Sequence, residues 1–240
     1  MKVLVIPDVH LKPAMFLRAG ELIKSLKADR CVCLMDIPDD WNKQYNLELY
    51  KETFDQAIFF QNEYPDTLWC WGNHDLSYVW NLSESGYSKL AENIVSRQID
   101  KLIEALPNDS QIAYIHRIDN VLFLHGGLSE GFVKMHLDAD LETYDDVDKV
   151  VSRVNGLEPS YIWSEGSPLW LRPQYNNLSM YKSDQILQVV GHTPVKDIIK
   201  DEKRNFISCD VFSTYRDGSQ YGTNKFLFLN TEDWSFQSVS

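Results

Sequence analysis

The sequence predicts an α/β fold in which two mixed β-sheets pack face to face and helices flank them. Three observations support this prediction. Short continuous apolar runs recur along the chain, segments with helical periodicity separate several of them, and the last third carries strand-like runs without long helices between them. The chain has 240 residues, 44% of them hydrophobic, so it can bury a sizeable core. We expect one domain over residues 1–240.

Five apolar runs of strand length are each followed by a residue that can bind a metal ion or move a proton. The runs are KVLVIP, RCVCLM, TLWCW, NVLFL and ILQVV. In chain order, the residues that follow them are Asp8 and His10, Asp36, Asn73 and His74, His125, and His192. Functional groups gather beyond the carboxyl ends of strands in open α/β sheets, so we expect these side chains to share one site.

The remaining elements follow from spacing and turn residues. Residues 14–27 and 47–64 carry apolar residues at the spacing of amphipathic helices. Asp119 and Asn120 lie between two strand-like runs and should form a hairpin turn. The runs RNFISCDV, NKFLFLN and SFQSV predict further strands. Residues 128–185 interrupt the strand pattern, and we expect an insertion of helices and loops there that shapes the mouth of a pocket.

The acidic composition limits the partners that the chain can bind. With 35 acidic and 23 basic residues the formal net charge is -12, which repels nucleic acids and anionic membrane surfaces. We therefore expect no nucleic-acid and no membrane partner. An anionic substrate would need a locally positive field, which bound cations could supply. The acidic run over residues 138–148 is expected to be a solvated helix face.

The first residues and the cysteines indicate a reducing compartment. The start, MKVLVIPDVH, has only five apolar residues in a row after Lys2, too few for a signal-peptide core or a membrane span. We therefore expect a cytoplasmic protein. Cys31 and Cys33 lie two apart in an apolar run, so they should be free thiols that pack as small hydrophobic side chains.

The residue types at the ends of the runs favour a transition-metal centre. Asp, His and Asn ligands suit Mn, Fe, Zn or Ni better than a soft ion or Ca²⁺. Asp8 and His10 lie two apart, so on an extended segment they point the same way and can hold one ion. Two-metal sites activate a bridging water to hydroxide and stabilise both oxygens of an in-line displacement, which makes hydrolysis of a phosphate ester the expected reaction. We expect Asp36 to bridge the two ions.

His74 is the predicted general acid. It directly follows Asn73, and adjacent side chains on an extended segment diverge, so both should not reach one metal ion. A histidine over the leaving oxygen needs an orienting carboxylate. Asp39, three residues past Asp36, is the predicted partner.

Five motifs together resemble a known family. DVH, MDIPDD, GNHD, HGGLS and GHTP, in this order over residues 3 to about 212, resemble the calcineurin-like metallophosphoesterases. They are most similar to the phosphoprotein phosphatase (serine/threonine phosphatase-like) branch, of bacterial or phage type, whose pattern is DxH, GDxxDRG, GNHE, HGG and GH. The resemblance implies a two-sheet αββα sandwich. It also implies a first metal at Asp8 and His10, a bridge at Asp36, a second metal at Asn73, His125 and His192, and an acid pair of His74 and Asp39.

The motifs also depart from that pattern. Met35 and Trp41 stand where it has glycine, Asp75 stands where it has glutamate, and Asp40 stands where it has arginine. The arginine of the pattern holds the phosphate, so another arginine should fill the gap, because a guanidinium meets phosphate oxygens in a bidentate way. Arg172 in PLWLRP is the first candidate and Arg216 in STYRDGS is the second.

The expected function is metal-dependent hydrolysis of phosphomonoesters, on a phosphorylated small molecule or protein, by attack of a metal-bridging hydroxide. Two alternatives stay open. SPLWLRP followed by VVGHTPV also resembles bacterial diadenosine tetraphosphatases of this branch, so the substrate could be a dinucleoside polyphosphate. The lost arginine also leaves open a metal-binding scaffold with weak turnover.

Overall fold

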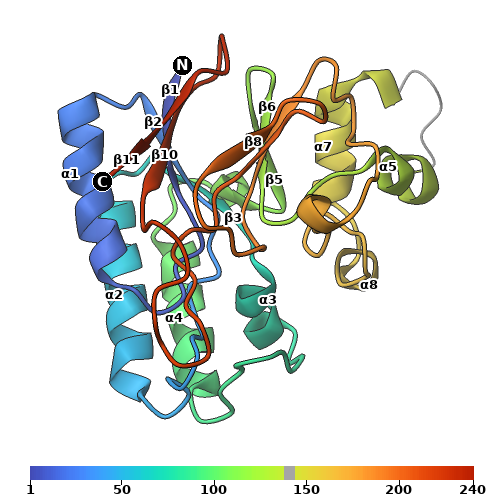
Figure 1. Cartoon of the computed structure of the whole chain (residues 1–240). Coiled ribbons are helices and arrows are strands. Elements are labelled where there is room, and N and C mark those ends of the chain that lie inside the picture. Colours follow the sequence, from blue (N-terminus) through green and yellow to red (C-terminus); the bar gives the residue numbers. More distant parts are fainter. Residues whose placement is uncertain (138–143) are drawn as a thin grey trace.

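Two mixed β-sheets form the centre of the fold, and helices lie outside them (Figure 1). This computed structural model describes residues 1–137 and 144–240. The first sheet has the strand order β11 (Phe236–Val239), β10 (Phe226–Asn230), β1 (Lys2–Ile6), β2 (Arg30–Cys33), β3 (Leu68–Cys70) and β4 (Ile112–Ala113). The second has the order β5 (Ile115–Ile118), β6 (Val121–Leu124), β7 (Leu187–Val190), β9 (Phe206–Ser208) and β8 (Ile199–Asp201). The predicted α/β fold with two mixed sheets is confirmed.

Both sheets have parallel strands at the centre; antiparallel pairing occurs at one edge of the first sheet and at both edges of the second. In the first sheet β1, β2, β3 and β4 pair in parallel, and β10 and β11 are antiparallel. In the second, β6, β7 and β9 pair in parallel, and β5 and β8 run against them. The predicted hairpin turn at Asp119 and Asn120 joins β5 to β6, with Ile118 opposite Val121.

The two faces of the second sheet contribute to two hydrophobic cores. Val121 and Phe123 point into the core that also contains the residues of β1 and β2. Leu122 and Leu124 point the other way, into a second core. This alternation follows from the period of two in a strand, and it is the geometry of two sheets packed face to face.

The helices divide between these cores. The first core receives α1 (Ala14–Leu26), α2 (Leu47–Glu63) and α4 (Glu92–Glu104). The second receives α5 (Glu130–His136), α7 (Val147–Asn155) and α8 (Pro159–Ile162). A short helix, α3 (Asn73–Val79), begins directly after β3, and the 3₁₀ turns η1 (Asp109–Gln111) and η2 (Pro173–Tyr175) lie in connections. In α2, Asn46 caps the first turn by accepting from the Leu49 N–H at 3.3 Å, which sets where the helix begins.

The predicted strands and both predicted helices are present. Sequence analysis did not predict α3, α4, β4 or β8. Val95, Ile99 and Leu102 of α4 are buried with helical spacing, but polar residues surround them and no functional residue follows. The described part of residues 128–185 contains α5, α7, α8 and η2. Part of the acidic run at 138–148 lies outside the described residues.

Two smaller expectations can also be compared with the structure. All four cysteines are free and buried, as predicted for Cys31 and Cys33. Among the described residues, no helix is both long enough and apolar enough to span a bilayer.

Candidate metal centre

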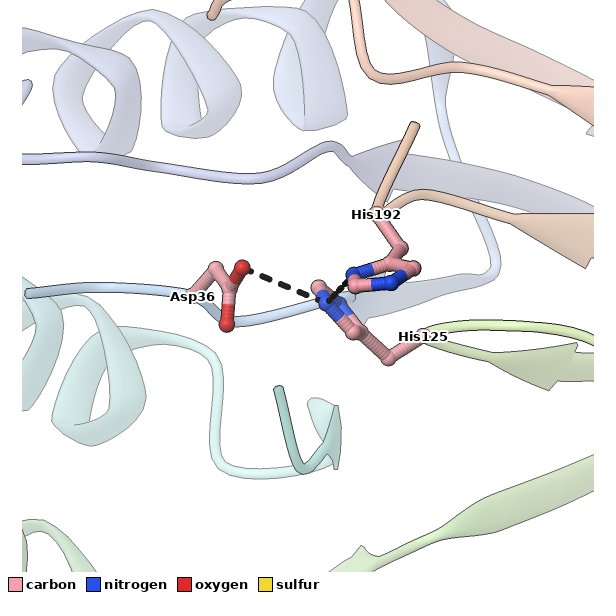
Figure 2. Close-up of side chains that lie close together, drawn as sticks. All are labelled: Asp36, His125 and His192. Atoms are coloured by element: carbon pink, nitrogen blue, oxygen red, sulfur yellow. Dashed lines mark hydrogen bonds and ion pairs between the residues drawn. The ribbon is translucent and has the colours of Figure 1, made fainter. Parts of the chain in front are cut away.

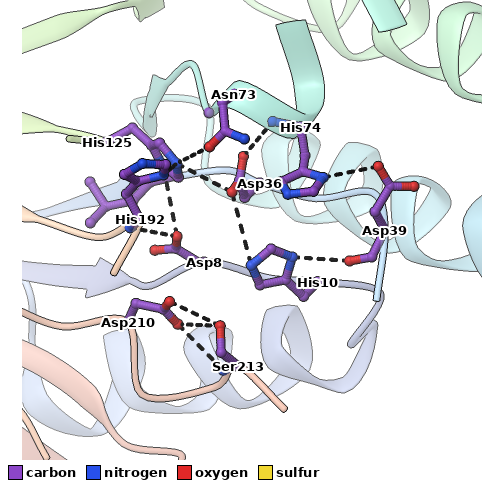
Figure 3. Close-up of polar contacts among 12 residues, drawn as sticks. Asp8, His10, Asp36, Asp39, Asn73, His74, His125, His192, Asp210 and Ser213 are labelled. Atoms are coloured by element: carbon purple, nitrogen blue, oxygen red, sulfur yellow. Dashed lines mark hydrogen bonds and ion pairs between the residues drawn. The ribbon is translucent and has the colours of Figure 1, made fainter. Parts of the chain in front are cut away.

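The predicted ligands come together at the carboxyl ends of parallel strands (Figure 3). Because β1, β2 and β3 are parallel neighbours, and so are β6 and β7, the residues that follow them are carried to the same edge of the two sheets. In strand order these residues are Asp8 after β1, Asp36 after β2, Asn73 after β3, His125 after β6 and His192 after β7.

Two groups of side chains have the spacing of metal ligands, and they share one carboxylate. Asp8, His10 and Asp36 form the first group, and their ligand atoms all lie within 4.8 Å of one another. Asp36, His125 and His192 form the second group with the same limit (Figure 2). All of these residues are buried except His10, which is partly exposed. A carboxylate common to both groups is in position to bridge two cations.

The surroundings of His125 favour a bound cation. Its Nδ1 lies 3.1 Å from the Leu34 carbonyl oxygen and donates to it. Its Nε2 lies 3.0 Å from Asn73 Oδ1, 3.1 Å from His192 Nδ1 and 3.2 Å from Asp36 Oδ2. One proton on Nε2 could satisfy only one of these three atoms, so the others would meet lone pair to lone pair. A metal ion resolves this conflict, because lone pairs from several donors converge on it.

A buried polar atom without a partner supports the same conclusion. Among the described residues, Asp8 Oδ1 is buried and has no hydrogen-bond partner. Leaving a buried carboxylate oxygen unpaired is costly, and a bound cation would satisfy it. The donor set of carboxylate, imidazole and amide oxygen fits Mn, Fe, Zn or Ni.

The glycines that precede two ligands are needed for close approach of the backbone. A Cβ on Gly72 would lie 2.1 Å from Asp36 Oδ1, and a Cβ on Gly191 would lie 1.9 Å from Asp8 Oδ1. No side chain fits at either position, so the glycines of the motifs GNHD and GHTP give the carboxylates their space.

Backbone conformation and hydrogen bonds orient the ligands. His10, Asp36 and His192 have φ values of 43°, 44° and 61°, a region that side chains other than glycine rarely adopt and that is enriched at functional sites. The His192 N–H donates to Asp8 Oδ2 at 2.7 Å. His10 Nδ1 lies 3.0 Å from the Asp39 carbonyl oxygen, which leaves its Nε2 toward Asp36. Such contacts fix which nitrogen is available to a metal ion.

His74 and Asp39 form the predicted pair. His74 Nδ1 lies 3.0 Å from Asp39 Oδ2, while Asp39 Oδ1 accepts hydrogen bonds from the hydroxyls of Tyr50 at 2.8 Å and Tyr78 at 2.7 Å. Burial lowers the pKa of His74. The neighbouring carboxylates of Asp36 and Asp39 raise this pKa by more than burial lowers it, so the pKa is about 9. An oriented, protonated imidazole therefore stands beside the metal ligands at neutral pH.

The local structure differs from the one used to predict these roles. Asn73 and His74 do not lie on an extended segment: they are the first two residues of α3. Their side chains still diverge, because successive residues of a helix point in different directions. His10 likewise has a left-handed backbone, so it shares a group with Asp8 through the shape of a turn and not through strand geometry.

Asp75 is a buried carboxylate that sequence analysis listed only as a departure from the motif. Its side chain accepts from the backbone N–H groups of Asp36 at 2.8 Å, Ile37 at 3.1 Å and Gly72 at 3.2 Å. It therefore holds the loop of the shared carboxylate against the start of α3. Burial and then the Asp36 charge raise its pKa well above the usual value.

Asp210 was also missed as a site residue. It is 1% exposed, and both carboxylate oxygens accept from the Ser213 hydroxyl, at 2.8 and 2.9 Å. Burial, Asp210 and Asp36 together raise the pKa of Asp8 well above its usual value. The signal was present in the sequence, because Asp210 follows the apolar run of β9 just as the other ligands follow theirs.

A pocket opens over this centre. Of the two candidate arginines, Arg172 lines it and Arg216 does not. Arg172 lines the pocket and donates from Nη1 to the His192 carbonyl oxygen at 2.8 Å and to Thr193 Oγ1 at 3.3 Å. Arg216 is not among the lining residues, and its guanidinium carbon lies 5.0 Å from the centre of the Trp41 ring. The structure therefore brings Arg172, the first candidate, to the site.

A shared carboxylate between two ligand groups, next to a carboxylate-paired histidine in a pocket, defines the class of metal-dependent phosphoester hydrolases. The sequence comparison agrees: residues 1–224 match the model of the calcineurin-like phosphoesterase family, and the chain belongs to that family. No curated protein in the comparison matches the sequence.

Solved structures share the fold. The chain is similar to the cold-active protein-tyrosine phosphatase of a psychrophilic Shewanella species, with a TM-score of 0.57 and 17% identity over 100% of this chain and 80% of that one. A further structure of a cold-active protein tyrosine phosphatase gives a TM-score of 0.55 and 18% identity over 99% and 78% of the two chains. At these identities the likeness shows the common fold.

Proposed function

We propose that the protein hydrolyses phosphomonoesters with two divalent or transition metal ions that share Asp36. The observation that carries this proposal is the pair of ligand groups with one common carboxylate, at the base of a pocket that His74 and Arg172 also line. We assign the first ion to Asp8, His10 and Asp36, and the second to Asp36, Asn73, His125 and His192.

The bound ions would supply Lewis-acid chemistry: they lower the pKa of water and neutralise phosphoryl oxygens. The chain itself supplies the remaining steps. Arg172 Nη1 is engaged by the His192 carbonyl oxygen, and among the described contacts its other guanidinium N–H groups have no partner. We assign those groups to phosphoryl oxygens, which a guanidinium meets in a bidentate way.

His74 acts on the leaving group. Asp39 holds its Nδ1, so Nε2 is free to carry the transferable proton. With a pKa of about 9, the imidazole is protonated at neutral pH. The bond between phosphorus and the leaving oxygen breaks, His74 protonates that oxygen, and water supplies the new oxygen on phosphorus. The products are inorganic phosphate and an alcohol.

The segment 128–185 contributes to the pocket mouth in this proposal. It supplies Arg172 and also Trp170, whose ring contacts His192 edge to face at 5.4 Å between centroids. We propose that it shapes access to the metal centre within a single domain.

Steady-state hydrolysis of p-nitrophenyl phosphate tests the proposal. The protein is stripped with a chelator and then supplied separately with Mn²⁺, Fe²⁺, Zn²⁺, Ni²⁺ or Ca²⁺. We expect turnover with one or more of the first four ions and little with Ca²⁺. Peptides with phosphoserine, phosphothreonine or phosphotyrosine follow as natural-type substrates, since the phosphatases that share the fold make phosphotyrosine a reasonable first choice. Tight metal binding without turnover of any ester would identify a metal-binding scaffold instead.

A further inference from the structure

The charges around the pocket are arranged unevenly, and from this arrangement we infer that the substrate's leaving group carries no negative charge and preferably carries a positive one. This inference rests on the proposed function and narrows its substrate class. It favours phosphomonoesters of neutral or basic alcohols, such as a phosphorylated residue in a basic peptide, over dinucleoside polyphosphates.

Positive charge is confined to the side of the pocket where the phosphoryl group would bind. Arg172 is the one Lys or Arg side chain among the described residues that line the pocket, and it is fixed on the His192 backbone. The residues that would hold the metal ions, Asp36 and the histidines, lie on the same side. Bound there, the ions would add their positive charge to that of Arg172.

The side of the leaving group is acidic. The proposed acid His74, which contacts Asp39, would protonate the leaving group, so the leaving group would lie on the side of these two residues. Asp40 is the next residue along the chain and lines the pocket. The segment with Glu84 also lines it and lies against Asp39, since a Cβ on Gly86 would be 3.6 Å from the Asp39 Cβ. A leaving group protonated by His74 would therefore depart past two carboxylates.

Nearby cations do not reverse this field. Lys12 Nζ lies 3.3 Å from Asp40 and also donates to the His10 carbonyl oxygen at 3.0 Å, so it offsets the charge of Asp40 but does not line the pocket. Arg216 is held over the ring of Trp41. Among the described residues, no cation forms an ion pair with Glu84, which leaves its charge uncompensated.

The consequence for a substrate follows from charge complementarity. A dinucleoside polyphosphate carries several negative charges beyond the phosphoryl group that is attacked. Those charges would lie beside Glu84, which pairs with no cation among the described residues, and beside Asp40, which pairs with Lys12. Juxtaposed like charges suppress binding. An ammonium or guanidinium group on the leaving side would instead be attracted to these carboxylates, more strongly at low salt.

A matched pair of phosphopeptides tests the inference. The two peptides have the same length and the same phosphotyrosine, flanked by Lys in one and by Glu in the other, and diadenosine tetraphosphate is the third substrate. We measure kcat/KM at low and high salt for the wild type, Glu84→Gln and Asp40→Asn. Glu52→Gln, an exposed carboxylate on α2 that does not line the pocket, is the control.

We expect the wild type to prefer the Lys-flanked peptide by about tenfold at low salt, with diadenosine tetraphosphate the poorest substrate. The preference should fall to about threefold or less in Glu84→Gln and in Asp40→Asn, shrink at high salt, and persist in Glu52→Gln. Equal rates for both peptides in the wild type, or faster turnover of diadenosine tetraphosphate, would overturn the inference. Absence of metal-dependent turnover of every ester, p-nitrophenyl phosphate included, would instead refute the proposed function.

Discussion

At the scale of single residues, one neighbour fixes which ring nitrogen is available in three of the four site histidines. His125 donates from Nδ1 to the Leu34 carbonyl oxygen, His10 Nδ1 contacts the Asp39 carbonyl oxygen, and His74 Nδ1 contacts the Asp39 carboxylate. In each ring the other nitrogen is left for a metal ion or for the substrate. The type of neighbour distinguishes a metal ligand from a general acid. A carbonyl oxygen accepts a hydrogen bond from a neutral imidazole that binds a metal ion, whereas a carboxylate stabilises a protonated imidazole that acts as an acid.

The first prediction concerns this acid. His74→Gln should keep the metal ions and slow the chemical step by roughly 10²–10⁴-fold, the usual contribution of a general acid. The deficit should be smaller for p-nitrophenyl phosphate than for a phosphoserine peptide, because p-nitrophenolate leaves without a proton. Rates for both substrates and the metal content are the measurements. An equal loss on both esters would mean that His74 does not protonate the leaving group.

The second prediction concerns the arginine of the pocket. Arg172→Lys should lower kcat/KM by the worth of one or two charge-assisted hydrogen bonds, roughly 1.5–3 kcal/mol each, because lysine cannot make a bidentate contact. Metal content should not change. Arg216→Lys is the matched control, since Arg216 does not line the pocket. A loss in Arg216→Lys with a normal Arg172→Lys would exchange the two roles.

Sequence reasoning reached the residues that directly follow apolar runs and missed those whose part depends on tertiary contacts. Asp36, His125 and His192 are of the first kind, because the end of a parallel strand fixes their place. Asp75 is of the second kind: its hydrogen bonds from the Asp36 and Ile37 N–H groups join segments far apart in sequence. Arg172 and Arg216 both lie in irregular segments, so only the structure distinguishes them.

At the scale of elements, the site depends on how closely strand ends and loops approach one another. The loop after β2 touches the start of α3, where Gly72 lies against Asp36. Continuous apolar runs made the central strands easy to predict. The strands β4 and β8 have two and three residues, too few to show a pattern. The pairing of β4 also depends on β3, which is distant in sequence.

The third prediction tests whether the close contact between Gly72 and Asp36 is needed for the site. Gly72→Ala should weaken metal binding and destabilise the fold, because the added Cβ would lie 2.1 Å from Asp36 Oδ1. Gly131→Ala is the control, since the nearest atom to its Cβ would be Ser129 Oγ at 3.8 Å. Metal affinity by calorimetry and unfolding in urea are the measurements. Wild-type metal affinity in Gly72→Ala would show that the loop adapts and that glycine is not required there.

At the scale of the whole molecule, folding concentrates negative charge in the interior. Asp8, Asp75 and Asp210 are buried together, and burial raises the pKa of each, with neighbouring carboxylates adding to the effect. The metal-free fold therefore carries an electrostatic cost that bound cations would relieve. An acidic protein with a net charge of -12 gains additional stability from such ions.

The fourth prediction is the resulting dependence of stability on pH. The pKa of His74 is raised to about 9 in the fold, so its contribution is complete below its unfolded value and is lost as pH rises through about 9. The raised pKa values of Asp8, Asp75 and Asp210 lower the stability of the fold as the pH rises above the ordinary carboxylate range. The pKa values of His10 and His192 are lowered. These two residues therefore change the stability of the fold only at pH values in or below the ordinary histidine range. The free energy of unfolding of the metal-free protein should therefore fall from pH 7 to pH 9.

Urea unfolding across this pH range checks the fourth prediction, with His74→Gln as the control. The fall should be shallower in the variant, and saturating Mn²⁺ should stabilise the wild type more at pH 9 than at pH 7. A metal-free stability that rises with pH over this interval would mean that the buried carboxylates and His74 do not carry the assigned charges.

The fifth and most direct measurement is the number of tightly bound ions in the wild type and in Asp36→Asn, by equilibrium dialysis against Mn²⁺ followed by elemental analysis. Asp36 belongs to both ligand groups, so removing its charge should weaken both sites together. We predict two ions per chain in the wild type and the loss of tight binding at both sites in the variant, with two ions retained in the surface control Asp66→Asn. One ion in the wild type, or two tightly held ions in Asp36→Asn, would contradict the shared centre on which the proposed function rests.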